Sequence, residues 1–251
     1  MPRFVARWAE RLGAELRAVE AWWLPAECLL CLGPVPGREG QALVCAACRR
    51  KWHPVAPPHC PRCGETLEGG PGAGHACPGA DWPAVLAGVR SAAWLDAGAR
   101  RAVHFLKYEG WWRLADDLAA VMRPLEPLGP GAVLVPVPLG ARRERERGYN
   151  QAERLAAALG RLAGLPVRSR LLARARETPT QTKLTPEARR ANVHGAFRVR
   201  EPLPGGRLVL VDDVYTTGAT LAAAAEALAA ASAARVEAVT FARGTGPLPR
   251  S

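Results

Sequence analysis

The segment from Arg207 to Thr220, RLVLVDDVYTTGAT, restricts the fold of this chain more than any other stretch. Its apolar run, Leu208–Val211, predicts a buried strand, and the small polar residues at its end predict a turn into a helix. A buried strand that feeds such a helix is typical of a parallel sheet, where ligands bind at the carboxyl ends of the strands. The segment therefore predicts an α/β domain with a ligand site at this turn.

The rest of the chain from residue 84 onward supports that fold class, because apolar runs and amphipathic stretches alternate. Such an alternation is typical of a mostly parallel sheet flanked by helices on both faces. The predicted strands are Val85–Leu95, Val133–Val137, Leu208–Val211 and Val236–Phe241, and the predicted helices are Ala97–Tyr108, Trp111–Met122, Gln151–Ala163 and Leu221–Ala233.

The turn after Val211 has the residue types that an anionic sugar ligand requires. A helix that begins near Thr216–Thr220 offers free amides and a positive dipole end to an anion, and Gly218 would let the backbone approach it closely. Asp212 and Asp213 could accept hydrogen bonds from sugar hydroxyls or bind Mg²⁺. The plainer alternative is a capped helix after an acidic turn, and two adjacent acids before Thr-Thr-Gly disfavour it.

Seven cysteines lie in the first third of the chain and indicate a metal-binding module. A single CxxC could be a redox dithiol, but three pairs close together are typical of zinc, since two such turns complete a tetrahedron of thiolates. Few apolar residues accompany them, so the metal would stabilise the module. The cysteines are Cys28, Cys31, Cys45, Cys48, Cys60, Cys63 and Cys77.

Sequential pairing is the simplest assignment of these ligands. The first four cysteines would hold one structural zinc, and Cys60, Cys63 and Cys77 would hold a second with His75 as the best fourth ligand. Asp81 and His59 are the next candidates for that position. An interleaved pairing and a metal-free second group also remain compatible with the spacing.

The predicted organisation is a helix over residues 1–24, a zinc ribbon module over 25–83 and the α/β domain over 84–251. Apolar residues recur every three or four positions between residues 3 and 23, which predicts an amphipathic helix. We expect this helix to dock on the protein, with a partner or a membrane surface as the alternative.

Charge and apolar patterning limit the function classes. The formal net charge of +11 fits partners such as nucleic acid or phosphorylated metabolites. However, the charge is almost all arginine and isoleucine is absent, which also fits the drift of a GC-rich genome. There is no apolar run of about 18 residues and no signal-peptide pattern, so we expect a cytoplasmic protein.

The segment Asp212–Thr220 resembles the phosphoribosyl pyrophosphate motif of type I phosphoribosyltransferases, two acids followed by T-T-G-x-T after an apolar strand. The resemblance implies that the acids contact ribose hydroxyls, with Mg²⁺ bound alongside phosphoribosyl pyrophosphate. It also implies that a threonine-rich loop holds the 5-phosphate; its residues here are Thr216, Thr217, Gly218, Ala219 and Thr220. We place the hood that recognises the acceptor base at Val85–Leu114.

Further motifs resemble the ComF family, in which a cysteine-rich ribbon precedes such a domain. That resemblance implies a role in uptake or processing of single-stranded DNA during natural transformation, with helicase or membrane-channel partners at the inner membrane. The chain departs from the family where Cys77-Pro-Gly-Ala lacks the last cysteine of a fourth CxxC. The matching segments are Phe105–Gly110, Val135–Pro138, Arg142, Arg143, Arg147–Ala152, Thr178, Gln181, Arg189, Asn192, Val193, Gly195 and Phe197.

The fold also implies roles for two basic segments. The loop after the first parallel strand would meet pyrophosphate, so Pro138, Arg142, Arg143 and Arg147 are expected to form a basic patch that faces pyrophosphate or DNA. The alternative is a solvated helical turn with local ion pairs. The polar segment Ala173–Arg190 would be a flexible loop that closes over the site and brings Lys183 or Arg189 to the leaving group.

Two functions from different classes follow. One is an Mg²⁺-dependent transferase that moves phosphoribosyl to a nitrogen acceptor, and the other is a DNA-handling protein in which the phosphate site serves binding. The sequence shows no general base, so catalysis would depend on positioning and on Mg²⁺.

Overall fold

The computed structural model describes residues 27–35, 42–67, 69–70, 74–77, 79, 81–176, 193 and 195–244. Two compact units divide the chain, residues 1–51 and residues 52–251. The helix expected over residues 3–23 lies outside the described residues, as do Lys183 and Arg189. Of the expected closing loop, residues 173–176 are described, and residues 177–190 lie outside the described part of the chain.

The smaller unit has one described helix, α2 (Ala46–Arg50), which begins directly after Cys45. The Cys45 side chain accepts a hydrogen bond from the Cys48 amide and thereby caps this helix. A bridge between Glu27 and Pro34 closes the turn that contains the first CxxC pair.

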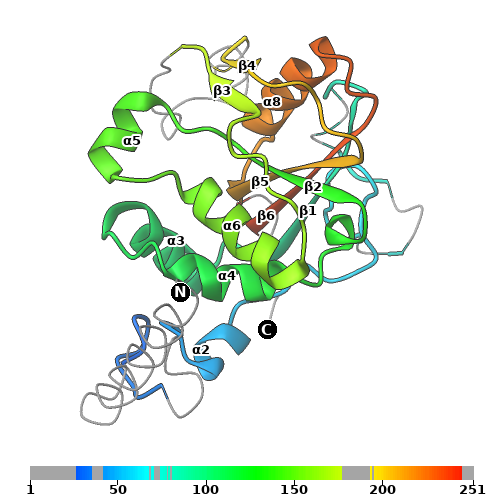
Figure 1. Cartoon of the computed structure of the whole chain (residues 1–251). Coiled ribbons are helices and arrows are strands. Elements are labelled where there is room, and N and C mark those ends of the chain that lie inside the picture. The colour runs from blue at the N-terminus through cyan, green and yellow to red at the C-terminus, as the bar shows by residue number, and fades with distance from the viewer. Residues whose placement is uncertain are drawn as a thin grey trace, which may run out of the picture. The chain divides into compact units, whose positions relative to one another are not determined.

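The larger unit is built on a four-stranded parallel sheet with the strand order β1-β6-β5-β2, as Figure 1 shows. β5 and β6 are the central strands, and their residues are largely buried because helices cover both faces. The parallel sheet predicted from the alternation of elements is confirmed. The strands are β1 (Leu86–Trp94), β2 (Ala132–Pro136), β5 (Arg207–Tyr215) and β6 (Val236–Arg243).

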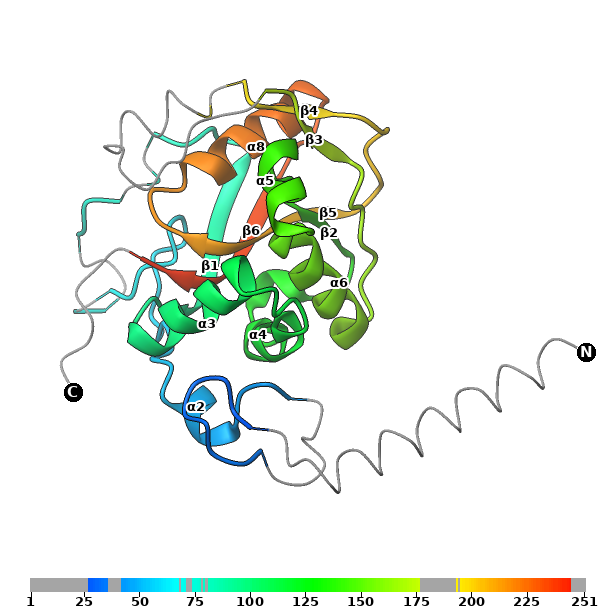
Figure 2. The ribbon, with the colours of Figure 1, turned by 90° about the vertical axis from the view of Figure 1, so that its left-hand side faces the viewer.

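The helices form layers on the two faces of this sheet. In Figure 2, α3, α4 and α6 lie on one side of the sheet, and the orange helix α8 lies on the other. α5 carries no buried residue, so it contributes little to the core. The bounds are α3 (Ala97–Tyr108), α4 (Leu114–Met122), the 3₁₀ helix η2 (Glu126–Leu128), α5 (Ala141–Arg147), α6 (Gln151–Ala163) and α8 (Ala219–Ala230).

A second, two-stranded sheet was not predicted. β3 (Leu172–Arg174) and β4 (Phe197–Val199) pair antiparallel, and β4 packs against α8. Three-residue strands give too short a pattern to be recognised in a sequence. This small sheet brings Arg174 to the carboxyl edge of the main sheet.

β5 is longer than predicted, and this is a correction. The expected strand ended at Val211, whereas the observed strand continues through both acids to Tyr215. β2 pairs with β5 only as far as the Pro136–Val211 pair, but β6 continues alongside to the Tyr215–Arg243 pair. The backbone therefore stays extended through the acids because β6 still supplies hydrogen-bond partners there.

A second correction concerns the base-recognition hood expected over Val85–Leu114, because its first part belongs to the main sheet. Residues Leu86–Trp94 form β1, an edge strand of the main sheet that pairs parallel with β6. Their alternating and mostly buried pattern suits a sheet rather than an independent lid.

The core of the larger unit includes part of the cysteine-rich segment. Cys60, Cys63 and Trp82 belong to the same buried cluster as Leu210 and Tyr215 of β5. The module expected over residues 25–83 thus has its two cysteine groups in different compact units. Among the described residues, no helix is long and apolar enough to cross a membrane.

Candidate functional site

The candidate site lies at the carboxyl ends of β2 and β5, which are neighbours in the sheet. The chain leaves β2 toward α6 on one face and leaves β5 toward α8 on the other. This reversal opens a crevice between the two strand ends, and ligands of open α/β sheets bind in such crevices.

A pocket of about 520 Å³ opens at this point. Such a volume falls in the range of small-molecule sites. Residues far apart in the sequence line it, and they come from α3, the loop after β2, α5, β3, β5 and the start of α8. The charged and hydroxyl-bearing lining residues are Lys107, Tyr108, Arg142, Arg143, Glu146, Arg147, Arg174, Asp212, Asp213, Thr216 and Thr220.

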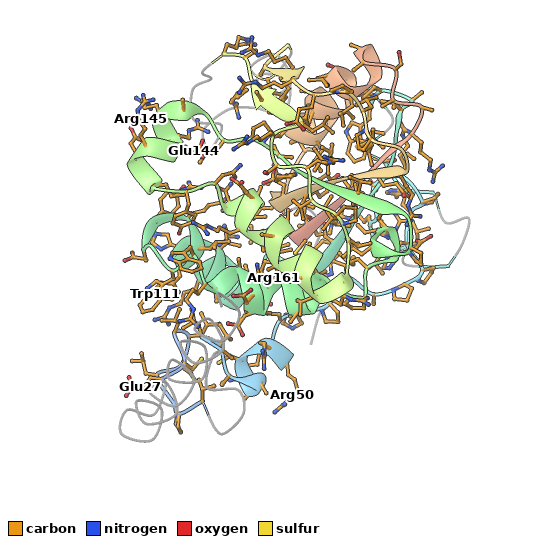
Figure 3. The ribbon with its side chains drawn as sticks, viewed as in Figure 1. Glu27, Arg50, Trp111, Glu144, Arg145 and Arg161 are labelled. Atoms are coloured by element: carbon orange, nitrogen blue, oxygen red, sulfur yellow. The ribbon has the colours of Figure 1, made fainter. Side chains whose placement is uncertain are left out.

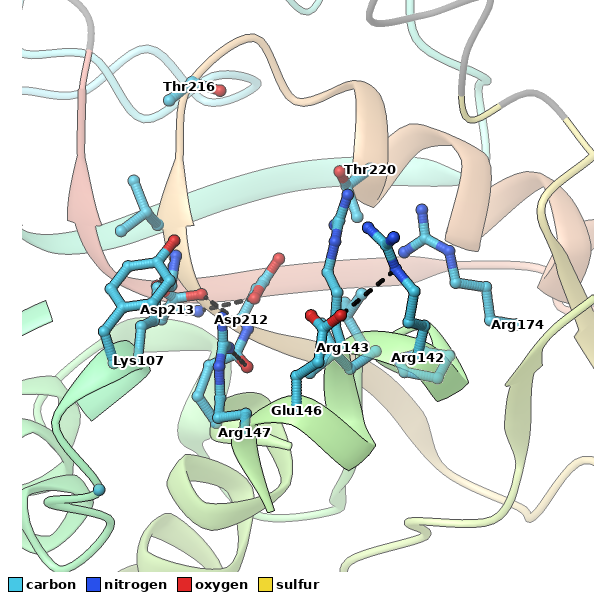
Figure 4. A pocket seen from close by; sticks show the side chains of 17 residues that line it. Lys107, Arg142, Arg143, Glu146, Arg147, Arg174, Asp212, Asp213, Thr216 and Thr220 are labelled. Carbon is cyan, nitrogen blue, oxygen red and sulfur yellow. Dashed lines mark hydrogen bonds and ion pairs between the residues drawn. The ribbon is translucent and has the colours of Figure 1, made fainter. Parts of the chain in front are cut away.

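Asp213 is the most enclosed acid of the pocket, with 2% of its surface exposed. Lys107 from α3 forms an ion pair with its Oδ2 atom, and Gln151 from α6 donates a hydrogen bond to its Oδ1 atom at 3.2 Å. Arg147 in turn donates to the Oε1 atom of Gln151. Figure 4 shows Lys107, Asp213 and Arg147 close to Asp212.

The two adjacent acids have opposite charge preferences. Burial together with the Asp213 carboxylate raises the pKa of Asp212 well above its ordinary value. Burial also disfavours ionised Asp213, but the Lys107 ammonium outweighs it and the pKa of Asp213 is lowered. Burial opposes the charge on Lys107, yet Asp213 raises the pKa of Lys107. The site therefore favours the charge on Asp213 and disfavours the charge on Asp212.

The segment Arg147–Gln151 connects the elements around the pocket. Gly148 ends α5 with a left-handed conformation at φ 82°. The Tyr149 hydroxyl donates to the Leu106 carbonyl, which joins α6 to α3. Asn150 caps α6 by accepting from the Ala152 amide at 3.0 Å, and its Nδ2 donates to the Val137 carbonyl at 3.1 Å. This segment therefore holds the loop after β2 against the start of α6.

The phosphate loop, which we define as Thr216–Thr220, connects β5 to α8. Thr216 and Thr220 line the pocket, as Figure 4 shows. The Ala219 amide has a long contact of 3.5 Å to Thr217 Oγ1. Among the described residues, the amides of Thr217, Gly218 and Thr220 donate to no protein acceptor. The loop therefore keeps donors for an anion at the start of α8.

The structure gives two further reasons for a glycine at position 218. Its φ of 76° favours glycine, and the space where a Cβ would lie is taken by the Trp82 ring, whose Cε2 atom would be 2.7 Å away. The expected close approach to an anion stays a prediction. Gly218 and Ala219 are buried, and neither lines the pocket.

The basic patch lies on α5 and faces the phosphate loop. In Figure 4 the guanidinium groups of Arg142, Arg143 and Arg174 are directed toward Thr220. Arg142 also forms an ion pair with Glu146 at 3.5 Å. Figure 3 shows Arg145 pointing outward from the same helix. The segment is therefore an exposed helix with a local ion pair, as the alternative held, and it also lines the pocket.

The structure thus places Pro138, Arg142, Arg143 and Arg147 around the same pocket as Asp212, Asp213, Thr216 and Thr220. Sequence reasoning quoted Lys107 and Gln151 only as parts of motifs and did not select Arg174. Lys107 had a recognisable signal, because it is one of only three lysines in the chain. Arg174 lies in the segment Ala173–Arg190 that is expected to close over the site, but its place at the pocket depends on the unpredicted β3–β4 pairing.

The first metal-ligating group consists of Cys28, Cys31, Cys45 and Cys48. Their sulfur atoms all lie within 4.8 Å of one another, and the Cys31 and Cys45 sulfurs are 3.9 Å apart. A tetrahedral zinc with bonds of about 2.3 Å requires sulfur separations of about 3.8 Å. The amides of Leu30 and Cys45 donate to Cys28 Sγ at 3.4 Å, as is usual for thiolates on a metal.

The second group, which we call the second cysteine group, consists of Cys60, Cys63, His75 and Cys77. Cys60 and Cys77 have sulfurs 3.8 Å apart, and His75 Nε2 lies 3.1 Å from Cys63 Sγ. His75 therefore occupies the place that a fourth thiol would take. His59 Nδ1 and Asp81 are not part of this group among the described residues.

The donor sets fit zinc on electrostatic grounds. Burial raises the pKa of the Cys48 thiol to about 12 in the first group. Burial likewise raises the pKa of the Cys63 thiol to about 12 in the second. Several thiolates cannot share such a small buried space without a cation, and zinc supplies that charge. Both groups would be closed four-ligand sites, which serve structure rather than chemistry.

Two family models match the chain. A double zinc ribbon domain matches residues 19–79, and a phosphoribosyl transferase domain matches residues 146–250. The first match covers both cysteine groups and the second covers β5, the phosphate loop and α8. Structural zinc in the ribbon is therefore supported by the family as well as by the geometry.

Curated relatives match part of the chain at about two-fifths identity. DNA utilization protein YhgH of Salmonella typhi is 40% identical over 104 residues, which is 41% of this chain and 46% of that protein. Competence protein F of Haemophilus influenzae is 41% identical over 91 residues, which is 35% of this chain and 40% of that protein. Competence protein ComFC of Bacillus subtilis is 40% identical over 97 residues, covering 38% of each. The matched stretch thus spans less than half of each relative.

Among solved structures, orotate phosphoribosyltransferase from Aeropyrum pernix aligns with a TM-score of 0.32 at 22% identity, covering 62% of this chain and 72% of that one. The fold assignment does not depend on this alignment, since the parallel sheet and the family model establish it. The chain thus matches a double zinc ribbon model and a phosphoribosyl transferase model in succession, and part of it is similar to competence proteins F and ComFC.

Proposed function

We propose that the pocket between β2 and β5 binds phosphoribosyl pyrophosphate with Mg²⁺, and that the protein uses this site in handling single-stranded DNA during DNA uptake. The observation that carries the proposal is that two adjacent acids, the phosphate-loop residues Thr216 and Thr220 and four arginines line one pocket. An acidic edge suits a ribose with its metal, and a basic edge suits phosphates.

Each part of the ligand then has a matching part of the pocket. The ribose hydroxyls would meet Asp212 and Asp213, where Mg²⁺ would also supply charge neutralisation when bound. The 5-phosphate would lie against the phosphate loop at the positive end of α8. Arg142, Arg143 and Arg174 face the same space and would bind the remaining phosphate oxygens.

Isothermal titration with phosphoribosyl pyrophosphate and MgCl₂ tests this assignment. We expect the wild type to bind and an Asp212→Asn, Asp213→Asn variant to lose at least about a hundredfold in affinity, because charge-assisted contacts would vanish. Asp116→Asn is the matched control, since this exposed acid on α4 pairs with Arg161 away from the pocket. Equal affinity in the double variant and the control would refute the site.

The proposed DNA role is supported by an aromatic and basic surface next to the pocket. Tyr108, Trp111 and Trp112 are 68%, 42% and 45% exposed. Arg147 lies 5.3 Å above the Tyr108 ring, and Arg154 lies 4.8 Å above the Trp112 ring. Tyr108 and Arg147 also line the pocket, so this surface is continuous with it. Stacked aromatic rings beside arginines are typical of single-stranded nucleic-acid binding.

Fluorescence anisotropy with a labelled oligothymidylate over a range of salt concentrations tests the DNA role. We expect a steep loss of affinity with salt, and a Trp112→Ala, Arg154→Ala variant should bind at least about tenfold more weakly. Arg235→Ala is the charge control, since its exposed guanidinium pairs with Glu237 ahead of β6. The DNA role is excluded if the wild type does not bind or if both variants bind equally.

The second candidate function is a phosphoribosyl transfer to a nitrogen acceptor without DNA. Tyr108 and Gly110 line the pocket near the acids, so an aromatic acceptor has a face to stack on. Release of pyrophosphate from phosphoribosyl pyrophosphate on addition of nitrogenous bases, together with no binding of oligothymidylate, would favour this function over the first.

A further inference from the structure

The Trp82 ring packs against Gly79 and Gly218, two positions where a side chain would collide with the ring. A Cβ at Gly79 would come within 2.9 Å of its Cε3 atom, and one at Gly218 would come within 2.7 Å of its Cε2 atom. The ring is 94% buried and also contacts Tyr215 edge-on, with the ring centroids 6.0 Å apart. Trp82 therefore packs against the end of β5 and the phosphate loop together.

The backbone of Trp82 is held by the second cysteine group. Arg62 lies between the ligands Cys60 and Cys63, and its Nη2 donates to the Trp82 carbonyl at 2.8 Å. Its Nε donates to the Gly79 carbonyl at 2.6 Å, two residues after the ligand Cys77. One side chain thus fixes both the Trp82 backbone and one of the two glycines that enclose the ring.

The same metal-binding turn is joined to the sheet. The Val89 amide of β1 donates to the Arg62 carbonyl at 2.9 Å. A buried arginine of β6, Arg243, donates to the Cys63 carbonyl at 3.0 Å and lies 5.0 Å above the Tyr215 ring. Two routes therefore run from this turn to the end of β5, one through Arg62 and Trp82 and one through Arg243 and Tyr215.

We propose that Trp82 is a positioning residue through which the second cysteine group, when it holds zinc, sets the conformation of the phosphate loop. This inference rests on the proposed binding of phosphoribosyl pyrophosphate at that loop. Gly218 is in the left-handed region, and the Trp82 ring packs directly against it without lining the pocket. Without the ring, the loop would lose the contact that keeps its amides arranged for an anion. Affinity for phosphoribosyl pyrophosphate would therefore depend on a zinc site that does not itself contact phosphoribosyl pyrophosphate.

Trp82→Leu and Trp52→Leu form a matched pair of variants for the test. Trp52 is similarly buried, but its ring packs edge-on against Phe241 of β6, with the ring centroids 5.0 Å apart. We expect Trp82→Leu to weaken phosphoribosyl pyrophosphate binding by about tenfold or more, since small displacements of a positioned group are costly. Trp52→Leu should lower thermal stability comparably and leave the affinity within about twofold.

Hydrogen exchange of the amides at residues 214–220 gives a readout that requires no ligand. We expect faster exchange there in Trp82→Leu, with bound zinc unchanged when measured by mass spectrometry of the metal. Arg62→Ala is the second variant, and it serves alone if Trp82→Leu does not fold. Arg62→Ala should also speed the exchange of these amides. When it is combined with Trp82→Leu, the exchange should be little faster than in Trp82→Leu alone, because both substitutions act along one route.

The outcomes separate the two proposals. If the wild type does not bind phosphoribosyl pyrophosphate, the proposed function fails, whatever the variants do. If the wild type binds while Trp82→Leu and Arg62→Ala leave both the affinity and the loop exchange unchanged, the positioning role is refuted. Equal weakening by Trp52→Leu would also refute it, since a general loss of packing would then explain the effect.

Discussion

At the scale of single residues, the ion pair between Lys107 and Asp213 is the strongest constraint on the pocket. Asp213 is buried, and Lys107 reaches it from α3, so each charge offsets the desolvation of the other. The pair also favours the charge on Asp213 over the charge on its neighbour Asp212, because the Lys107 ammonium lowers the pKa of Asp213 while burial raises that of Asp212.

Lys107→Met should therefore be costly. Removing one partner of a buried pair leaves an uncompensated charge, which typically lowers the free energy of unfolding by about 3–5 kcal/mol. Urea unfolding at neutral pH measures this, with Lys51→Met as an exposed control expected to change it by less than about 0.5 kcal/mol. A loss below about 1 kcal/mol for Lys107→Met would contradict the pairing.

Gly218→Ala tests the packing of Trp82 on the phosphate loop. Gly164 has a similar positive φ, 67° against 76°, but nothing lies within 4 Å of its missing Cβ. Gly164→Ala should thus cost about 1–2 kcal/mol of stability for the left-handed backbone alone. Gly218→Ala should cost about 1–3 kcal/mol more because of overpacking. Equal losses in thermal unfolding would show that the ring does not crowd this position.

At the scale of elements, α3 depends on its N-cap residue, Asp96, for both capping and charge. Asp96 accepts hydrogen bonds from the Ala99 amide at 2.8 Å and from His53 Nδ1 at 2.9 Å. Burial opposes its ionisation, but these donors prevail and the pKa of Asp96 is lowered. A depressed folded pKa gives stability that is present above the unfolded value of about 3.9 and is lost as pH falls toward the folded pKa.

The free energy of unfolding should therefore differ between the wild type and Asp96→Asn in a way that depends on pH. Asparagine keeps a capping oxygen but loses the charge, so the wild type should be more stable at pH 6. The difference should shrink as pH falls below about 4. Urea unfolding over this pH range measures it, and a difference that is constant with pH would show that the Asp96 charge contributes nothing.

Elements with long patterns could be predicted from the sequence, and short ones could not. The predicted bounds of α3 and α6 match the structure because each has an amphipathic stripe and a capping residue, Asp96 or Asn150. The end of β5 was missed because its last residues are held by pairing with β6, which local sequence does not report. β3 and β4 could not be predicted because three residues are too few to show the alternation of apolar and polar side chains that identifies a strand.

At the scale of the whole molecule, the two cysteine groups belong to two different compact units, while one family model spans both. The clustering of the ligands could be expected from their spacing. The integration of the second group into the core of the sheet could not, because it depends on long-range contacts such as Arg243 with Cys63.

Metal analysis tests this organisation. We expect two zinc ions per chain, one for each group, and one zinc fewer in a Cys60→Ser variant. Removal of zinc by a chelator should lower the thermal stability of the larger unit, because its core contains Cys60 and Cys63. A single zinc in the wild type that the Cys60→Ser variant retains would exclude zinc binding by the second cysteine group, and with it His75 as a fourth ligand.

A crystal structure of the chain with phosphoribosyl pyrophosphate and Mg²⁺ tests the central claim most directly. The account predicts the 5-phosphate within hydrogen-bonding distance of the amides between Thr217 and Thr220, and ribose hydroxyls or the metal beside Asp212 and Asp213. Ligand density away from the carboxyl ends of β2 and β5, with the phosphate loop empty, would contradict it.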